Sequence, residues 1–215
     1  LEYDPRNFEQ RIIIDLRLVR LAAALRDGAG GGGGGPRRGG GGRNPPCEPP
    51  NPRPDAAPEA RRIGERIASE LGVTGVLAVE MFVVGEGADE RVLVNELAMR
   101  PHNTGHWTID GAVTSQFEQH LRAVLDLPLG STELRAPGTH AVMVNLLGSA
   151  HHQPARALAA AFSAGGGTAK VHLYGKEVRP GRKLGHVTVV DKDPDVALTR
   201  ARAAVEALHG TSATD

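Results

Sequence analysis

Two runs of apolar and β-branched residues, 76–84 (VLAVEMFVV) and 91–97 (RVLVNEL), flank a Gly-Glu-Gly-Ala-Asp-Glu segment. Such runs predict β-strands, and a break rich in Gly and Asp predicts the turn of a hairpin. With the turn centred near Ala88, Glu80 and Glu96 lie opposite each other, where paired side chains have Cβ atoms about 5 Å apart. We therefore expect two carboxylates to face each other across an antiparallel ladder.

Both glutamates alternate in step with apolar neighbours, so a period of two points them toward a covered face. These neighbours are Ala78, Phe82, Val92 and Val94. Two close carboxylates repel unless a cation lies between them, and Mg²⁺ takes one or two protein carboxylates together with phosphate oxygens. The adjacent Asn95 could add an amide. The alternative is a solvated sheet face on which both glutamates pair with Lys or Arg.

A polar loop follows the second run. Five side chains suited to hydrogen bonding or stacking occur within eight residues, among a proline and a glycine: Arg100, His102, Asn103, His106 and Trp107. Few structural loops need so many donors, so we predict that chemistry or binding takes place here.

The segment 174–186, YGKEVRPGRKLGH, is the second candidate site. Its cations are Lys176, Arg179, Arg182 and Lys183, against one acid, Glu177. Guanidinium groups hold phosphate through two parallel bonds, and glycines let backbone N–H groups approach, so the pattern predicts an anion site. The alternative is a basic hairpin tip that faces solvent.

Three separated motifs resemble the 5-(carboxyamino)imidazole ribonucleotide synthase family of ATP-grasp ligases. They are NELAMRPHNTGHWTID with TSQFEQH (95–120), MVNLLG (143–148) and YGKEVRPGRKLGHVT (174–188). The resemblance covers about residues 56–210. It implies an enzyme of de novo purine biosynthesis that carboxylates 5-aminoimidazole ribonucleotide with ATP and bicarbonate, through carboxyphosphate. It also implies a homodimer that uses Mg²⁺, with Mn²⁺ as an alternative.

The same resemblance implies roles for individual residues. The implied metal ligands are Glu80 and Glu96, and the implied nucleotide contacts are Asn95 and Glu96. The implied catalytic residues, which would act on carboxyphosphate, are Arg100 and Lys176. The implied substrate-binding residues are His102, Asn103, Lys176, Arg182 and Lys183. A formate-dependent glycinamide ribonucleotide transformylase would keep the paired glutamates but change the cosubstrate, and is the related alternative.

The expected fold class is α+β: the C-terminal half of an ATP-grasp domain, with an antiparallel sheet and helices, followed by a small α+β domain. Helices are predicted at 58–71, 114–126, 154–164 and 194–209, and further strands at 141–147, 169–174 and 184–190. Helix 114–126 should carry an apolar stripe of Phe117, Leu121, Val124 and Leu125, with Gln116, Glu118 and His120 on a solvated face. The expected segments are a low-complexity N-terminal segment (1–55), a partial ATP-grasp region (56–134), a C-terminal α+β domain (135–210) and a tail (211–215).

Ahead of residue 56 the sequence departs from the family pattern. Residues 12–25 suggest a helix face, eleven of the sixteen residues 28–43 are glycine, and proline-rich sequence continues to Pro58. We predict that segment 1–55 forms no packed core and is disordered or a misread frame. Without the N-terminal half of the family, including its phosphate-contacting lysines, we expect these residues alone to bind ATP poorly and turn over little.

The composition of the chain argues against nucleic-acid-binding, membrane and disulfide-rich proteins. Twenty-five basic and twenty-five acidic residues cancel, which gives no general attraction for nucleic acid. The Arg-Gly tract lacks interleaved aromatic residues for base stacking, so a non-catalytic fragment with an RNA-binding tail is the weaker alternative. No apolar run reaches the roughly 20 residues of a membrane span, and we expect neither a signal peptide nor a membrane partner. A single cysteine, Cys47, excludes an internal disulfide framework and suits a cytoplasmic protein.

Overall fold

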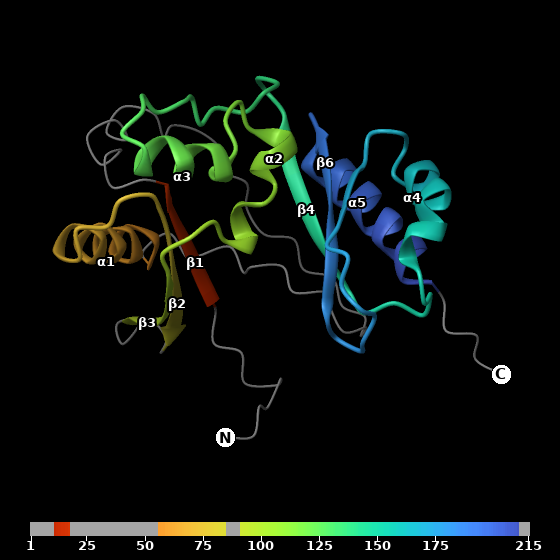
Figure 1. The fold of residues 1–215 in the computed structure, drawn as a ribbon, viewed down its shortest axis with the longest axis horizontal. Helices are drawn as coiled ribbons and strands as arrows, with labels where there is room; N and C mark the ends of the chain where they lie inside the picture. The colour runs from red at the N-terminus through yellow and green to blue at the C-terminus, as the bar shows by residue number, and fades with distance from the viewer. Residues whose placement is uncertain (1–10, 18–55, 85–90, 211–215) are drawn as a thin grey trace. The chain divides into compact units, whose positions relative to one another are not determined.

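The computed structural model describes residues 11–17, 56–84 and 91–210, and the chain divides into two compact units (Figure 1). The first unit comprises Leu1–Thr104 and Gln119–Leu129, and the second comprises Gly105–Glu118 and Gly130–Asp215. By contacts, residues 105–118 therefore group with the C-terminal residues. The domain boundary expected near residue 134 stays a prediction.

In the first unit, strands β1 (Arg11–Arg17), β2 (Val76–Val84) and β3 (Arg91–Ala98) form an antiparallel sheet in the order β1-β2-β3. The predicted hairpin is confirmed as β2 and β3. Alternate residues of β2 are buried against helix α1 (Ala56–Glu70), so the core lies between this helix and one face of the sheet. Its members include Ala60, Ala68, Leu77, Val79, Met81, Val83 and Val92.

The helix suggested for residues 12–25 is wrong over its described part, because residues 11–17 form β1 and pair antiparallel with β2. The sequence there contains three consecutive isoleucines, Ile12 to Ile14. β-Branched residues fit a pleated strand better than a helix, and a short apolar run cannot be assigned by periodicity alone. Residues 18–25 and the glycine-rich tract lie outside the described residues.

Helix α1 confirms the predicted amphipathic helix. Ile63 and Ile67, one helical turn apart, pack against the core. Gly72 follows the helix with a φ of +57°, the left-handed conformation that commonly ends a helix. Leu71, at the end of the range predicted as helical, is exposed.

Helix α3 (Gln116–Val124) forms where it was predicted, but its buried face is the polar one. Gln116 and Gln119 are 3% and 2% exposed, whereas Leu121 is 57% exposed. The remainder of the apolar stripe, Phe117, Val124 and Leu125, is exposed too. The prediction of a solvated polar face is therefore wrong for Gln116.

Two hydrogen bonds explain the orientation of α3. His120 is partly buried, and its Nδ1 accepts a hydrogen bond from the Val76 N–H of β2 at 3.0 Å, so the solvated placement is wrong for His120 as well. Ser115 Oγ accepts from the Glu118 N–H at 3.2 Å, the hydrogen bond by which an N-cap residue begins a helix. Glu118 itself is exposed, as predicted.

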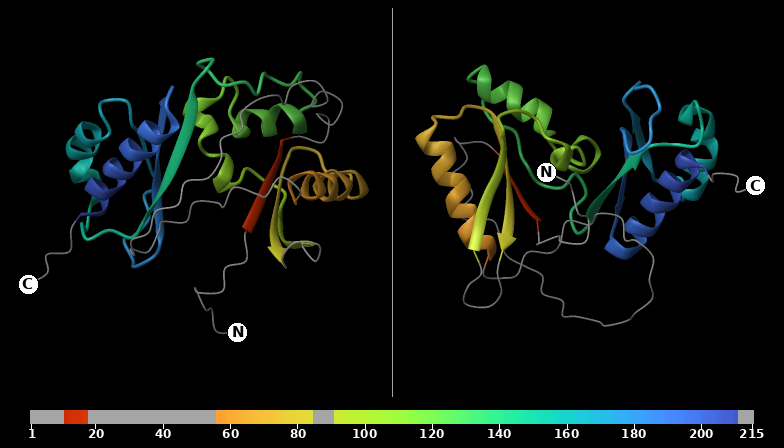
Figure 2. Two further views of the ribbon diagram at one scale, coloured as in Figure 1. Left: turned by 180° about the vertical axis from the view of Figure 1, so that it is seen from behind. Right: turned by 90° about the horizontal axis from the view of Figure 1, so that it is seen from below.

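The second unit contains another antiparallel sheet, in the order β4-β6-β5, made by β4 (His140–Leu147), β5 (Lys170–Leu173) and β6 (Lys183–Asp191). Helices α4 (Leu158–Ala164) and α5 (Pro194–His209) cover one face of it (Figure 2). The short helices α2 (Thr108–Gly111), η3 (Asn103–Gly105) and η4 (Pro154–Ala157) complete the described elements. All predicted elements of this region are confirmed, so the α+β class holds.

The start of α5 follows from its sequence. Asp193 Oδ1 accepts hydrogen bonds from the N–H groups of Asp195 and Val196, and Pro194 occupies the first turn, where it needs no donor. The buried positions of α5 are Ala197, Ala201, Ala204 and Leu208. Leu198 and Val205 are partly buried.

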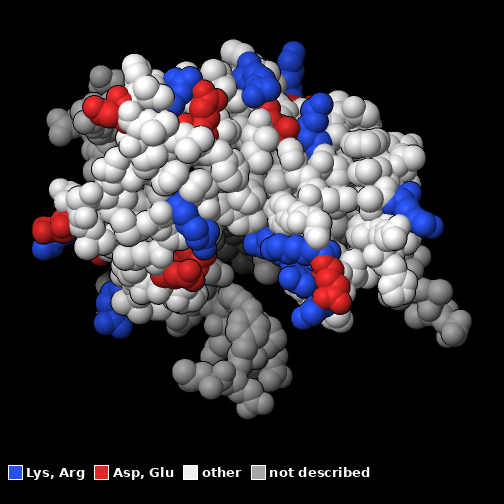
Figure 3. Space-filling model, viewed as in Figure 1, with Lys and Arg blue, Asp and Glu red and all other residues white. Residues whose placement is uncertain are grey.

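Acidic and basic side chains are interspersed over the face of the molecule seen in Figure 3, in keeping with the balanced formal charge. In the described part of the chain, no helix combines the length and the apolarity that crossing a bilayer requires.

Candidate functional site

The paired glutamates of the first unit occupy one register position. Glu80 on β2 is the Cα partner of Glu96 on β3, as the sequence predicts. Glu80 is 7% exposed and lies in the central strand, whereas Glu96 is exposed on β3. The covered environment predicted for both carboxylates is therefore confirmed for Glu80 and wrong for Glu96.

A β-bulge interrupts the ladder directly beside this pair. Glu80 pairs with Glu96, but the next residue, Met81, pairs with Val94, which leaves Asn95 as an extra residue on β3. A bulge shifts the alternation by one, so Val94 no longer shares a face with Glu96. The extra residue also brings the Asn95 Nδ2 to 3.4 Å from Glu80 Oε2, where the amide donates a hydrogen bond.

The polar loop after β3 returns to the buried carboxylate. The His102 Nε2 lies 3.3 Å from Glu80 Oε1, and its Nδ1 lies 3.0 Å from the Thr104 hydroxyl. Asn103 has a buried Oδ1 for which the described residues provide no hydrogen-bond partner. Arg100 is exposed, and its guanidinium donates to the Pro101 carbonyl at 3.3 Å. The first unit thus gathers an acid pair, an amide and an imidazole.

Further along the same loop, in the second unit, His106 is held by the first residue of α3. Gln116 Nε2 lies 2.8 Å from the His106 Nδ1. The Thr108 hydroxyl donates to the Gly105 carbonyl at 2.6 Å and accepts from the Gln116 N–H at 2.9 Å. These hydrogen bonds hold the backbone N–H and the side-chain amide of the buried Gln116, a residue that was predicted to lie on a solvated face.

The predicted basic loop connects β5 to β6 in the second unit. Arg179 is committed to Glu177, with its Nη2 and Nε 2.6 and 3.1 Å from one carboxylate oxygen. The Arg182 guanidinium donates to the Glu177 carbonyl at 3.4 Å. Lys176 is exposed, with its Nζ 5.4 Å from the centre of the Tyr174 ring. A local carboxylate therefore neutralises Arg179.

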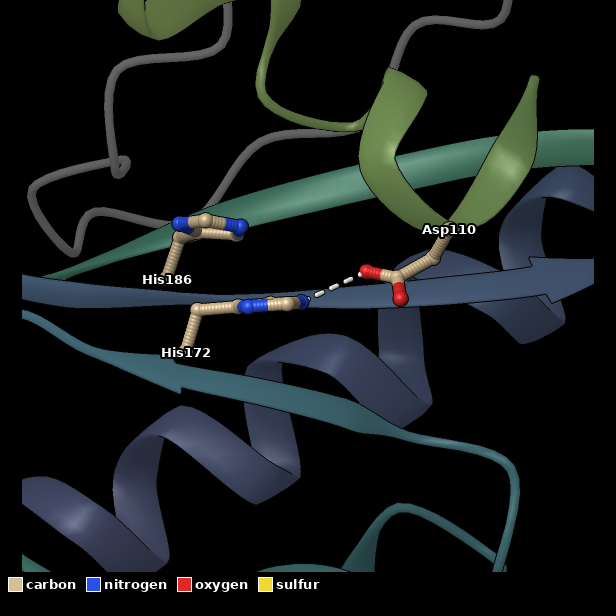
Figure 4. Close-up of side chains that lie close together, drawn as sticks. All are labelled: Asp110, His172 and His186. Carbon is tan, nitrogen blue, oxygen red and sulfur yellow. Dashed lines mark hydrogen bonds and ion pairs between the residues drawn. The ribbon is translucent and has the colours of Figure 1, made fainter. Parts of the chain in front are cut away.

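At the base of this loop lies a group that sequence reasoning missed (Figure 4). Asp110, His172 and His186 lie close together, and the Tyr174 hydroxyl lies 2.7 Å from the His186 Nδ1. Burial lowers the pKa of His186 from 6.5 to about 3, assisted by His172 and then His106. Burial also raises the pKa of Tyr174. The register between β5 and β6 brings the two histidines together, and this register could not be read from the sequence.

The sequence-predicted residues thus fall into two groups. Glu80, Asn95, Glu96, Arg100, His102 and Asn103 lie in the first unit, and Lys176, Arg182 and Lys183 lie in the second. Within the first group, the structure brings Glu80, Asn95 and His102 into direct contact.

Comparison with known families defines the class of protein. Residues 47–117 match the ATP-grasp domain, and residues 141–200 match the phosphoribosylaminoimidazole carboxylase C-terminal domain. The matched segments therefore carry ATP-grasp sequence followed by the C-terminal domain of a purine-pathway enzyme.

Within this class, the chain is similar to the C-terminal part of N5-carboxyaminoimidazole ribonucleotide synthases, which confirms the resemblance found in the motifs. It is 50% identical over 168 residues to the synthase of Corynebacterium ammoniagenes, covering 77% of this chain and 40% of that protein. The solved synthetase of Thermotoga maritima has a TM-score of 0.56 at 43% identity, covering 74% and 43% of the two chains. The chain spans about two fifths of the length of these relatives.

A third relative was solved with ligands. The Aspergillus clavatus synthase, in complex with ADP and 5-aminoimidazole ribonucleotide, has a TM-score of 0.59 at 35% identity, covering 74% of this chain and 42% of that one.

Proposed function

We propose that this chain provides the metal-binding and part of the substrate-binding residues of an N5-carboxyaminoimidazole ribonucleotide synthase. The reaction would convert ATP, bicarbonate and 5-aminoimidazole ribonucleotide into ADP, phosphate and the N5-carboxylated ribonucleotide, through carboxyphosphate. The observation that carries the proposal is the register pair of Glu80 and Glu96 beside Asn95. The ADP and 5-aminoimidazole ribonucleotide bound to the Aspergillus clavatus relative support the proposed nucleotide and ribonucleotide.

The donor set fits Mg²⁺, with Mn²⁺ as the alternative ion. Two carboxylates supply hard oxygen ligands, and the buried Glu80 needs a positive partner more than the exposed Glu96 does. When bound, such an ion neutralises charge on the transferred phosphoryl group. Asn95 would orient Glu80 through its amide and support the nucleotide beside Glu96.

The remaining roles follow from exposure and partners. Arg100 and Lys176 are exposed cations suited to holding carboxyphosphate. His102 and Asn103 would contact the imidazole ribonucleotide, and the unsatisfied Asn103 amide oxygen would accept a hydrogen bond from it. Arg182 and Lys183 would bind its phosphate. We also propose that the protein acts as a homodimer and that it is cytoplasmic. Analytical ultracentrifugation of the purified chain would test the dimer.

A thermal titration with Mg-ADP tests the metal and nucleotide site. A nucleotide that binds only the folded chain raises the melting temperature, by an amount equivalent to about 2.7 kcal/mol at a hundredfold excess over its Kd. We expect an increase for the wild type, a much smaller one for Glu96→Gln, and a full one for Glu70→Gln, which removes an exposed carboxylate of α1. No increase in the wild type, or equal increases in both variants, would contradict the proposal.

A further inference from the structure

The two histidines at the base of the basic loop are neighbours across the β5–β6 ladder. His172 and His186 are Cα partners, and their rings stack with centroids 4.6 Å apart and planes 16° apart. The loop of residues 174–182 connects these two strands, so the histidine pair lies where the loop leaves the sheet.

Asp110, from the single-turn helix α2, completes the group. Its Oδ2 lies 2.8 Å from the His172 Nε2 (Figure 4). One candidate ligand atom from each of Asp110, His172 and His186 lies within 4.8 Å of the other two. The three side chains come from three different elements of the second unit. The fold, rather than proximity in the sequence, therefore brings them together.

A second observation points to a ligand at this group. His186 is 1% exposed, and no described residue is a hydrogen-bond partner for its Nε2. Asn145, the register partner of His186 on β4, likewise has a buried Oδ1 that the described side chains and backbone leave unsatisfied. Buried polar atoms are rarely left without partners, and each exception calls for an unseen water, ion or functional role.

We infer that Asp110, His172 and His186 form a binding site for a divalent ion of the zinc type. Two imidazoles and a carboxylate are ligands that Zn²⁺ accepts, and three protein ligands leave one position of its tetrahedron open. Zinc lies about 2.0–2.2 Å from such ligands, so the 2.8 Å contact of His172 and Asp110 would open by several tenths of an ångström. The stacked rings would tilt so that both nitrogens face one ion.

The surroundings suit this role. A ligand imidazole must present a free ring nitrogen, and the buried His186 Nε2 has no hydrogen-bond partner among the described residues. Ligand histidines usually donate their second ring N–H to an oxygen, and the Tyr174 hydroxyl is placed 2.7 Å from the His186 Nδ1 to accept it.

Such an ion would clamp the base of the loop that carries Lys176 and Arg182. This site is separate from the Glu80–Glu96 pair in its residues and in its preferred ion, so it does not depend on the proposed carboxylation. Oxygen-only Mg²⁺ sites and imidazole-containing zinc sites are distinguished by their ligand chemistry.

The test is a Zn²⁺ titration of the tag-free, chelator-treated chain in competition with a chromophoric chelator. We expect one tight equivalent in the wild type, weakened about tenfold or more in His172→Gln and in Asp110→Asn, since even second-shell losses weaken metal sites on this scale. Both substitutions affect partly exposed side chains, and far-ultraviolet circular dichroism would verify that the variants fold.

Two control variants locate the ion. Removal of the exposed adjacent histidines in His151→Gln with His152→Gln, or of the acid pair in Glu96→Gln, should leave the tight equivalent in place. The unmutated chain gives a separate reading, because Co²⁺ at a tetrahedral site of nitrogen and oxygen ligands absorbs strongly in the visible. Absence of a stoichiometric equivalent, its persistence in His172→Gln, its loss in a control, or a weak octahedral Co²⁺ spectrum would overturn the inference.

Discussion

Glu80 and Glu96 share a register position but have different surroundings. Glu80 is buried and contacts both Asn95 and His102, whereas Glu96 is exposed at the edge of the sheet. Residue type and spacing suggest that the two glutamates are equivalent metal ligands. Their burial distinguishes them, because Glu80 is held in place by its neighbours, whereas the exposed Glu96 side chain can reorient toward a bound ion.

This difference predicts unequal costs of substitution in the absence of metal. Glu80→Ala leaves the partners of a buried carboxylate unsatisfied and should lower the free energy of unfolding by about 1–3 kcal/mol. Glu96→Gln alters an exposed side chain and should change it by less than about 0.5 kcal/mol. Urea unfolding of both variants with chelator present gives the comparison; equal losses would mean that Glu96 is as tightly held as Glu80.

His186 predicts a pH dependence of stability. Its pKa is about 3 in the folded chain and 6.5 when unperturbed, so between these values the unfolded chain binds a proton that the folded chain does not. Stability should therefore be complete above about pH 7 and fall as the pH decreases, with His186 contributing up to about 1.4 kcal/mol per pH unit.

Urea unfolding with chelator at about pH 7.5 and about pH 5.5 would measure this dependence. His186→Gln should flatten the change between the two conditions, while removal of an exposed histidine in His151→Gln should not. A profile that stays equally steep in His186→Gln would assign the proton uptake to other groups.

At the scale of elements, the hairpin shows how far a sequence pattern reaches. The turn position alone predicts that Glu80 pairs with Glu96, and the pair is found. The bulge at Asn95 could not be predicted, because period-2 alternation assumes an unbroken ladder. The prediction for helix α3 failed for another reason. Its hydrophobic stripe is clear in the sequence, but which face becomes buried depends on partners outside the helix, such as Val76 and His106.

Close pairing of β5 and β6 predicts that Gly185 cannot be replaced. A Cβ atom added at Gly185 would overlap the carbonyl oxygen of His172, a backbone atom that cannot rotate away. Gly185→Ala should force the strands apart and lower the free energy of unfolding by about 1–3 kcal/mol, as overpacking commonly does. Chemical denaturation would measure the loss, and an unchanged midpoint would show that the two strands separate without strain.

At the scale of the whole molecule, motifs identified the family resemblance and most elements, and the grouping of residues by contacts is a separate observation. Residues 105–118 follow the hairpin in sequence yet group with the C-terminal residues, because Val113 and Thr114 donate hydrogen bonds to the carbonyls of Glu133 and Ser131. The order of the motifs does not encode such hydrogen bonds between distant segments, and the segment boundaries expected from it stay predictions.

The last prediction concerns turnover. The chain spans about two fifths of its relatives, and the residues proposed here hold the metal and part of the ribonucleotide. Catalysis also requires that ATP be held in position beside these residues, because misplacement of reacting groups is costly in rate. We expect detectable Mg-ADP stabilisation, but ADP release at least about a hundredfold slower than that of the full-length Corynebacterium ammoniagenes relative. Release should be measured with 5-aminoimidazole ribonucleotide and either bicarbonate or formate. Turnover near that of the relative would contradict the expected slow ADP release. ADP release with formate but not with bicarbonate would show that formate, rather than bicarbonate, is the cosubstrate.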